Sequence, residues 1–211
     1  MTDEGDGRPT RSTILAAEYT VNDFEHWQSI LEQTPSQLRH LGARRLVVYR
    51  ALDEGNRVFT TVGIRKPQRV QKLLASPIPL EWFDLAGVQD IPSLFVGNRV
   101  ERIDLAQSSA GDLGAVIVAG IVRLDDPRKW LASVHEAADD LRNGGVLRIY
   151  VYGAIDDDRE VLIMQLIDTE RHARRWLKYK DEVAAWMVRA GVGAYPQLFV
   201  GRLANDLTID G

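Results

Sequence analysis

The chain has 211 residues, 45% of them hydrophobic and 27% charged, which is the composition of a folded protein rather than a disordered one. Its formal net charge of −4 argues against a nucleic-acid partner, since such proteins carry an excess of basic side chains. The sequence has no cysteine, which excludes disulfides, thiolate nucleophiles and cysteine-ligated metal sites. Residues 1–11 are acidic and glycine-rich, and no apolar run reaches the length of a membrane span, so we expect a cytoplasmic protein with no membrane partner.

The sequence contains a long internal repeat. Residues 79–97 align without gaps on residues 183–201 with nine identities in nineteen positions, where ordinary composition gives about one. Upstream the match continues at a spacing of 103 and pairs Trp27 with Trp130 and Tyr49 with Tyr152. We therefore predict a tandem duplication. Its parts are a disordered tail at 1–11, a first repeat at 12–105, a linker at 106–113 and a second repeat at 114–211.

Each half begins with a β-rich run, at 14–21 and 117–124, that predicts a first strand. Asp23 and Asp126 follow at positions typical of a helix N-cap, and Pro127 suits the first helical turn. Apolar side chains then recur at helical spacing and include the aligned tryptophans, which we expect to fill the core. The four histidines of the chain, His26, His40, His135 and His172, are expected to be solvated helix residues.

Two further strands follow the first helix in each half, and acidic turns join them into hairpins. They are predicted at 45–52, 58–64, 148–155 and 161–167. A second helix follows each hairpin, broken at Ser76–Pro79 in the first half and capped by Thr169 in the second. A last strand begins at Pro92 and at Pro196, and we expect a turn at Gly97–Asn98 that returns the chain as an extra edge strand.

The resulting order, β-α-β-β-α-β, is that of a ferredoxin-like α+β unit with an antiparallel sheet and both helices on one face. Residues 117–122 and 161–164 are apolar on both strand faces, whereas a strand buried on one side alternates. The second face of each sheet must therefore be covered. We predict two ferredoxin-like repeats whose sheets pack face to face as an α/β barrel within one chain.

The repeated motifs resemble those of the dimeric α/β-barrel superfamily, which includes antibiotic-biosynthesis-monooxygenase-like proteins. The resemblance rests on the Asp-x-x-x-Trp helix start, the Val-Tyr-x-Ala-x-Asp strand end and the Ala-Gly-Val approach to the last strand, and it covers nearly the whole chain. It implies the barrel fold, which two subunits usually build in that superfamily. It leaves the function open, because the superfamily includes cofactor-free oxygenases, haem enzymes, isomerases and proteins without known chemistry.

Strand alternation places Glu18 toward the barrel, where it is a carboxylate among aliphatic side chains. Burial there would make it a base, whereas a position at the barrel mouth would leave it in solvent. Its aligned partner is Ile121, so such chemistry would occur in one half only. For the second strand the pattern leaves two alternatives, with either Tyr49 or Arg50 facing inward.

The candidate catalytic residues are Glu18 and Tyr49. The candidate substrate-binding residues complete a mostly apolar lining that is typical of a small-molecule pocket. They are Arg50, Thr61, Arg123, Tyr152, Met164 and Gln165. No spacing of histidines and acids predicts a metal, and no phosphate loop or dinucleotide fingerprint is present, so we expect no cofactor.

These patterns favour a protein that binds a small, largely apolar organic molecule, as a cofactor-independent oxygenase or isomerase. The alternative is a non-catalytic binding or assembly protein whose barrel is filled by side chains, and a third interpretation is haem handling. Bare sheet edges and the apolar residues 78–83 also predict a homodimer.

Overall fold

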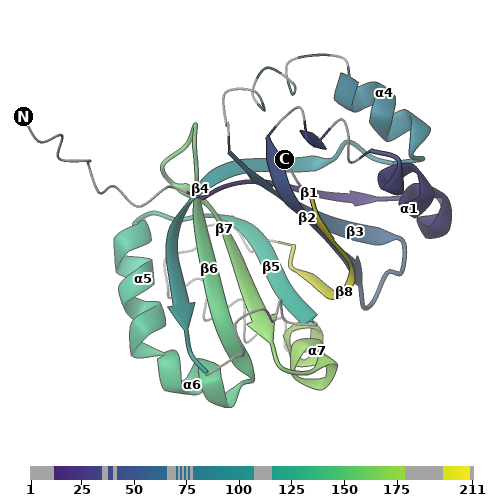
Figure 1. The fold of residues 1–211 in the computed structure, drawn as a ribbon. Coiled ribbons are helices and arrows are strands. Elements are labelled where there is room, and N and C mark those ends of the chain that lie inside the picture. The colour runs from purple at the N-terminus through teal and green to yellow at the C-terminus, as the bar shows by residue number, and fades with distance from the viewer. Residues whose placement is uncertain are drawn as a thin grey trace, which may run out of the picture.

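A computed structural model describes residues 12–34, 38–39, 42–65, 70, 72, 74, 76, 78–106, 116–178 and 197–209. Within these residues eight strands form a closed barrel in the order β1-β3-β2-β8-β5-β7-β6-β4. The described helices lie on the outside of this barrel, with α1 and α4 against one half and α5, α6 and α7 against the other (Figure 1). None of the described helices is long and apolar enough to cross a membrane.

The elements follow the predicted order in each half. The first half contains β1 (Thr13–Thr20), α1 (Phe24–Glu32), β2 (Ala43–Ala51), β3 (Arg57–Ile64), α4 (Ile78–Leu85) and β4 (Ser93–Asp104). The second contains β5 (Val116–Arg123), α5 (Pro127–Glu136), α6 (Ala138–Asn143), β6 (Val146–Ala154), β7 (Glu160–Ile167), α7 (Glu170–Lys178) and β8 (Phe199–Thr208). The N-caps are as expected, since Asp23 accepts from the His26 amide and Asp126 from the Arg128 and Lys129 amides.

The two halves share one pairing pattern and one register. β1 pairs with β3 and β4, and β5 pairs with β7 and β8. The pair Thr13 and Ile64 recurs as Val116 and Ile167, which is the same register shifted by the spacing of the sequence repeat. The last strand of each half also pairs with the other half, β4 with β6 and β8 with β2. None of these eight strands therefore has a free edge, which removes the bare edges as an argument for a homodimer.

The turn expected at Gly97–Asn98 is wrong, because β4 continues straight through both residues. A Cβ atom at Gly97 would lie 2.4 Å from the Phe95 ring and 2.5 Å from the Gly153 carbonyl oxygen. At Gly201 it would lie 2.3 Å from the Phe199 ring. The repeated Leu-Phe-Val-Gly motif thus places a phenylalanine ring over the glycine two residues later, so the glycine provides space inside the barrel rather than a turn.

The barrel interior is packed with side chains from all eight strands. Its buried residues are Ile14, Ala16, Val47, Tyr49, Ala51, Phe59, Phe95, Ile117, Ala119, Tyr152, Leu162, Met164, Leu166 and Phe199. The rings of Phe59 and Phe199 meet with centroids 5.3 Å apart. Eight strands enclose a space just wide enough for such side chains, so the described interior is a core.

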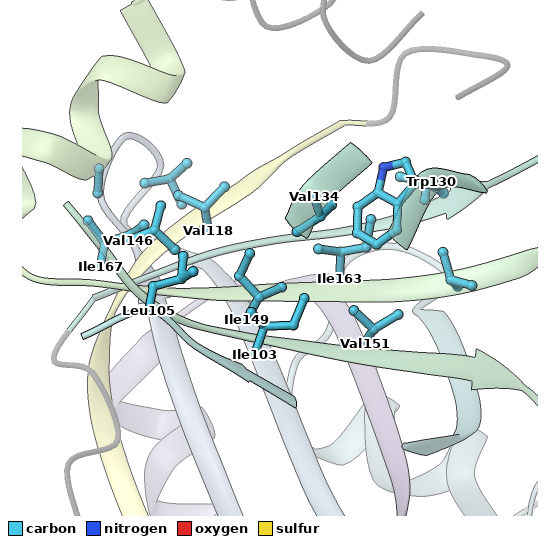
Figure 2. Close-up of a cluster of buried hydrophobic side chains, with 14 of the residues drawn as sticks. Ile103, Leu105, Val118, Trp130, Val134, Val146, Ile149, Val151, Ile163 and Ile167 are labelled. Carbon is cyan, nitrogen blue, oxygen red and sulfur yellow. The ribbon is translucent and has the colours of Figure 1, made fainter. Parts of the chain in front are cut away.

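Each half has a second core between its helices and the outer face of its strands. In the second half, Trp130 and Val134 of α5 lie over Ile163, and aliphatic side chains of β6 and β7 continue the layer (Figure 2). In the first half the corresponding layer lies between α1, α4 and the outer faces of β1 and β3. We call these the second and the first helix–sheet layer.

Candidate functional site

Glu18 faces the barrel from the end of β1, and its side chain is 21% exposed. The Arg57 Nε atom donates to Glu18 Oε1 at 2.8 Å, and Arg57 Nη2 donates to the Leu198 carbonyl at 2.7 Å. Burial raises the pKa of Glu18, and the neighbouring Arg57 charge lowers it by less. Glu18 is therefore a half-buried carboxylate in an ion pair, which lies between the two alternatives that the sequence left open.

Sequence reasoning missed Arg57, whose side chain is only 7% exposed. The signal was present in the internal alignment, where Glu18 and Arg57 correspond to Ile121 and Glu160. Because the second half lacks both the inward carboxylate and its guanidinium partner, the two residues form one paired unit that is particular to the first half. The ion pair lies at the end of the barrel where β1 ends and β3 begins.

The structure decides which face of the second strand is inside. Tyr49 and its counterpart Tyr152 both face the barrel interior. Arg50 lies on the outer face, where its guanidinium is 4.3 Å from the centroid of the Phe24 ring, so it is not a residue of the barrel lining. Thr61 is buried beside the inward Phe59 position on β3.

The candidates from the second half do not share one site. Met164 faces the barrel, whereas Gln165, the next residue on β7, faces the second helix–sheet layer with Val118 and Ile149 as its strand neighbours. The two cannot line one surface, because successive side chains of a strand point to opposite faces. Arg123 is largely exposed at the end of β5 and forms an ion pair with Asp157.

The first helix–sheet layer contains a continuous set of aromatic contacts, of which sequence reasoning considered only the tryptophans and favoured them as core residues. Tyr19 of β1 has ring centroids 6.0 Å from Trp27 and 5.7 Å from Phe83. Trp27 contacts Phe24 at 5.6 Å, and Phe83 contacts Trp82 at 5.5 Å in an edge-on arrangement. Five rings from β1, α1 and α4 thus pack together in this layer.

A few polar groups are buried within this aromatic layer. Burial raises the pKa of the Tyr19 phenol, and the neighbouring Thr60 hydroxyl and Trp27 indole lower it by less, so Tyr19 stays protonated. The Trp27 N–H has no hydrogen-bond partner of normal geometry among the described residues. The Trp82 N–H donates to the Thr34 hydroxyl at 3.1 Å. Few polar groups in an apolar surrounding are the usual composition of a small-molecule site.

The second helix–sheet layer differs at the same positions. Tyr19 and Thr60 of the first half correspond to Val122 and Ile163, both of which are buried among aliphatic side chains. The Trp130 N–H lacks a partner within the described part of the chain just as the Trp27 N–H does, so that feature does not distinguish the halves. The distinction lies in the extra rings and hydroxyls of the first half, and the mismatches in the internal alignment were the sequence signal for it.

The described residues include no group of three or more His, Asp or Glu that could hold a metal ion. Their histidines also do not fit a haem site. His26 and His135 contact oxygens of Leu85 and Glu101 at exposed positions, and His172 contacts Asp168 at the start of α7. His40 lies outside the described residues.

No protein-family profile and no curated protein matches the chain. Solved structures match over nearly its whole length. An anthrone oxidase-like protein has a TM-score of 0.64 and 14% identity, covering 95% of this chain and 94% of its own. A haem-binding protein from Thermus thermophilus has a TM-score of 0.53 and 13% identity, covering 92% of both chains.

A Listeria monocytogenes ferredoxin-fold protein related to antibiotic biosynthesis monooxygenases has a TM-score of 0.50 and 9% identity, covering 92% of this chain and 96% of its own. At such identities the likeness establishes the fold, which the closed barrel and the order of elements show independently. The chain therefore has the ferredoxin-like fold that the Listeria monocytogenes protein related to antibiotic biosynthesis monooxygenases also has.

Proposed function

We propose that this protein binds a small, largely apolar and flat organic molecule in the first helix–sheet layer. The observation that carries the proposal is the difference between the two halves. The first layer has the Tyr19 ring and the Thr60 hydroxyl at positions where the second layer has the aliphatic side chains of Val122 and Ile163. A layer that served packing alone would have no need of Tyr19 and Thr60, since Val122 and Ile163 fill the same positions.

The polar groups of the layer suit a ligand with a carbonyl or hydroxyl oxygen. The protonated Tyr19 phenol lies beside the Thr60 hydroxyl and the Trp27 N–H, and these polar groups are buried where an acceptor oxygen would be desolvated on binding. The anthrone oxidase-like neighbour supplies a chemical class that fits, a planar aromatic ketone. We propose a molecule of that class as the ligand.

Cofactor-independent oxygenase activity is the catalytic form of this proposal. Such a reaction needs a base that removes a proton from the bound molecule. None of the buried polar residues that the structure describes is an Asp, Glu or His, and Glu18 lies on the face of β1 opposite the first helix–sheet layer. The described residues therefore support binding of the molecule more directly than its oxidation. The filled barrel and the ion-paired Glu18 favour the non-catalytic form of the proposal.

The test uses anthrone as a probe and titrates the intrinsic tryptophan fluorescence. The variant Tyr19→Val/Thr60→Ile copies the second half into the first layer, and Trp130→Phe changes the second layer as a matched control. We expect saturable quenching in the wild type, weakening of about tenfold or more in the double variant, and wild-type affinity in Trp130→Phe. Absence of saturable binding, or equal weakening in both variants, would contradict the proposal.

A further inference from the structure

The barrel has a second mouth, opposite the Glu18–Arg57 ion pair, where β2 and β6 begin. These two strands lie opposite each other in the closed order of eight. Arg45 and Arg148 occupy equivalent positions on them. Arg45 makes two bonds of 2.7 Å to Asp206 on β8, and Arg148 pairs with Asp104 on β4. Each pair joins one half of the chain to the other, because β2–β8 and β4–β6 are the seams of the barrel.

The register shows that further charged side chains face the same interior. Residues directly opposite on paired strands share a face of the sheet. Arg99 stands opposite Tyr152 and Arg102 opposite Tyr150. Arg102 also bonds Asp104, at 2.8 and 3.1 Å, so one carboxylate serves two guanidinium groups.

Arginine is therefore in excess at this mouth. Four guanidinium groups, those of Arg45, Arg99, Arg102 and Arg148, accompany two carboxylates, those of Asp104 and Asp206. Among the described residues no acid pairs with Arg99. The mouth thus carries an uncompensated positive charge, which attracts an anion.

Three tyrosines lie just inside this mouth. Tyr49 projects from β2, and Tyr150 and Tyr152 project from β6 on the opposite wall, with their own ring centroids 6.3 Å apart. The Tyr150 hydroxyl accepts from Arg148 Nη1 at 3.3 Å. Burial raises the pKa of Tyr49, and it raises the pKa of Tyr152 to about 12, so both phenols remain protonated.

The hydroxyls of Tyr49 and Tyr152 have no hydrogen-bond partner among the residues that the structure describes, although the two residues are only 1% and 8% exposed. Neither hydroxyl is among the fully buried side-chain atoms of the described residues that lack a partner, so each oxygen reaches the mouth and can donate to a ligand there. The excess of guanidinium beside them makes an oxyanion the fitting acceptor. The partly buried Leu203 of β8 adds an apolar side chain beside these polar groups.

We propose that this mouth binds a small organic carboxylate, held by the Tyr49 and Tyr152 hydroxyls and by the surrounding arginines. The site is separate from the first helix–sheet layer, because it lies inside the barrel wall. Both halves contribute to it, so neither half would form it alone. One carboxylate oxygen accepts from each phenol, and the Arg99 charge balances the ligand.

The test titrates benzoate into the wild-type protein by calorimetry, with benzamide as the neutral isostere and inorganic phosphate as a second anion. We expect benzoate to bind, with an affinity that falls as salt is added, and benzamide to bind at least about tenfold more weakly. The proposal would be overturned if benzamide bound as tightly as benzoate. Phosphate binding as tightly as benzoate, with the same dependence on the tyrosines, would overturn the assignment of a carboxylate.

The variants remove the hydroxyls and keep the rings, which preserves the packing. Tyr49→Phe/Tyr152→Phe should lose at least about tenfold in benzoate affinity, and Arg99→Gln should also weaken benzoate binding. Arg128→Gln, on the exposed face of α5, is the matched control for the loss of one positive charge. Unchanged affinity in the double variant, with wild-type circular dichroism, would refute the site. The same double variant should bind anthrone like the wild type, so this inference and the proposed function can fail separately.

Discussion

Replacing Arg57 tests whether the Glu18–Arg57 ion pair stabilises the barrel mouth. Arg57→Leu removes the 2.8 Å bond to Glu18 and the 2.7 Å bond to the Leu198 carbonyl, at a side chain that is 7% exposed. Breaking a buried pair from one side costs about 3–5 kcal/mol, since the remaining charge is uncompensated. Glu18 is 21% exposed and can turn toward water, which reduces that cost. We expect a loss of about 2–4 kcal/mol in the free energy of unfolding at neutral pH.

The double variant Glu18→Ile/Arg57→Leu removes both charges and installs the residue found at the aligned position, Ile121. It should be more stable than Arg57→Leu alone, with a coupling of about 2 kcal/mol, because no buried charge remains. If the double variant is as unstable as the single one, the loss comes from packing and the ion-pair argument is refuted.

The pH dependence of Arg57→Leu has a defined sign. The pKa of Glu18 is already raised from 4.5 by burial, and removing Arg57 takes away an opposing influence. An acid whose folded-state pKa is raised contributes stability below its unfolded pKa, and that contribution is lost as the pH rises through the folded-state pKa. The difference in free energy of unfolding between the single and double variants should therefore be largest at neutral pH. It should disappear near pH 4.5. Urea unfolding followed by circular dichroism measures it, and a gap independent of pH would contradict the assignment to Glu18.

Three further predictions concern other parts of the chain. Gly201→Ala should destabilise the fold by about 1–3 kcal/mol or more, because the new Cβ would lie 2.3 Å from the Phe199 ring. The control is Gly63→Ala, whose new Cβ would have its nearest neighbour 4.0 Å away. Thermal denaturation of both variants measures the difference. Burial raises the pKa of Asp168, but its bonds to His172 and Thr169 outweigh this and leave it lowered from 3.8. Asp168→Asn should therefore cost less than about 1 kcal/mol at pH 7 in urea unfolding, and the difference should vanish as the pH falls below 3.8 through the folded-state pKa. Leu80, Leu85 and Ile91 remain exposed around α4, and we propose that they mediate a homodimer; sedimentation that shows only a 23.7 kDa species would contradict this.

The fold could be predicted from the sequence because it depends on patterns that recur. Strand alternation placed Glu18 and Tyr19 on opposite faces, and the N-cap aspartates fixed both helix starts. The prediction at Gly97 failed because a glycine needed for space beside a ring looks, in one sequence, like a glycine needed for a turn. The domain boundaries and the duplication itself stay predictions.

The candidate site was harder to predict because it depends on contacts between distant strands. Gln165 was placed in the lining although its neighbour Met164 already occupied that face. The pairing of Arg57 with Glu18 requires the β1–β3 register, which no local pattern contains. Comparing the two halves position by position would have singled out both Arg57 and Tyr19 without a structure.

The exchange of β4 and β8 between the halves has a consequence for assembly. A barrel built from two separate subunits dissociates on dilution, and its halves can exchange between molecules. Here the partner of every seam strand belongs to the same polypeptide, so each half meets the other at a high effective concentration. Barrel formation should then be independent of protein concentration. Each half can therefore diverge in sequence while the other half of the same chain remains its pairing partner.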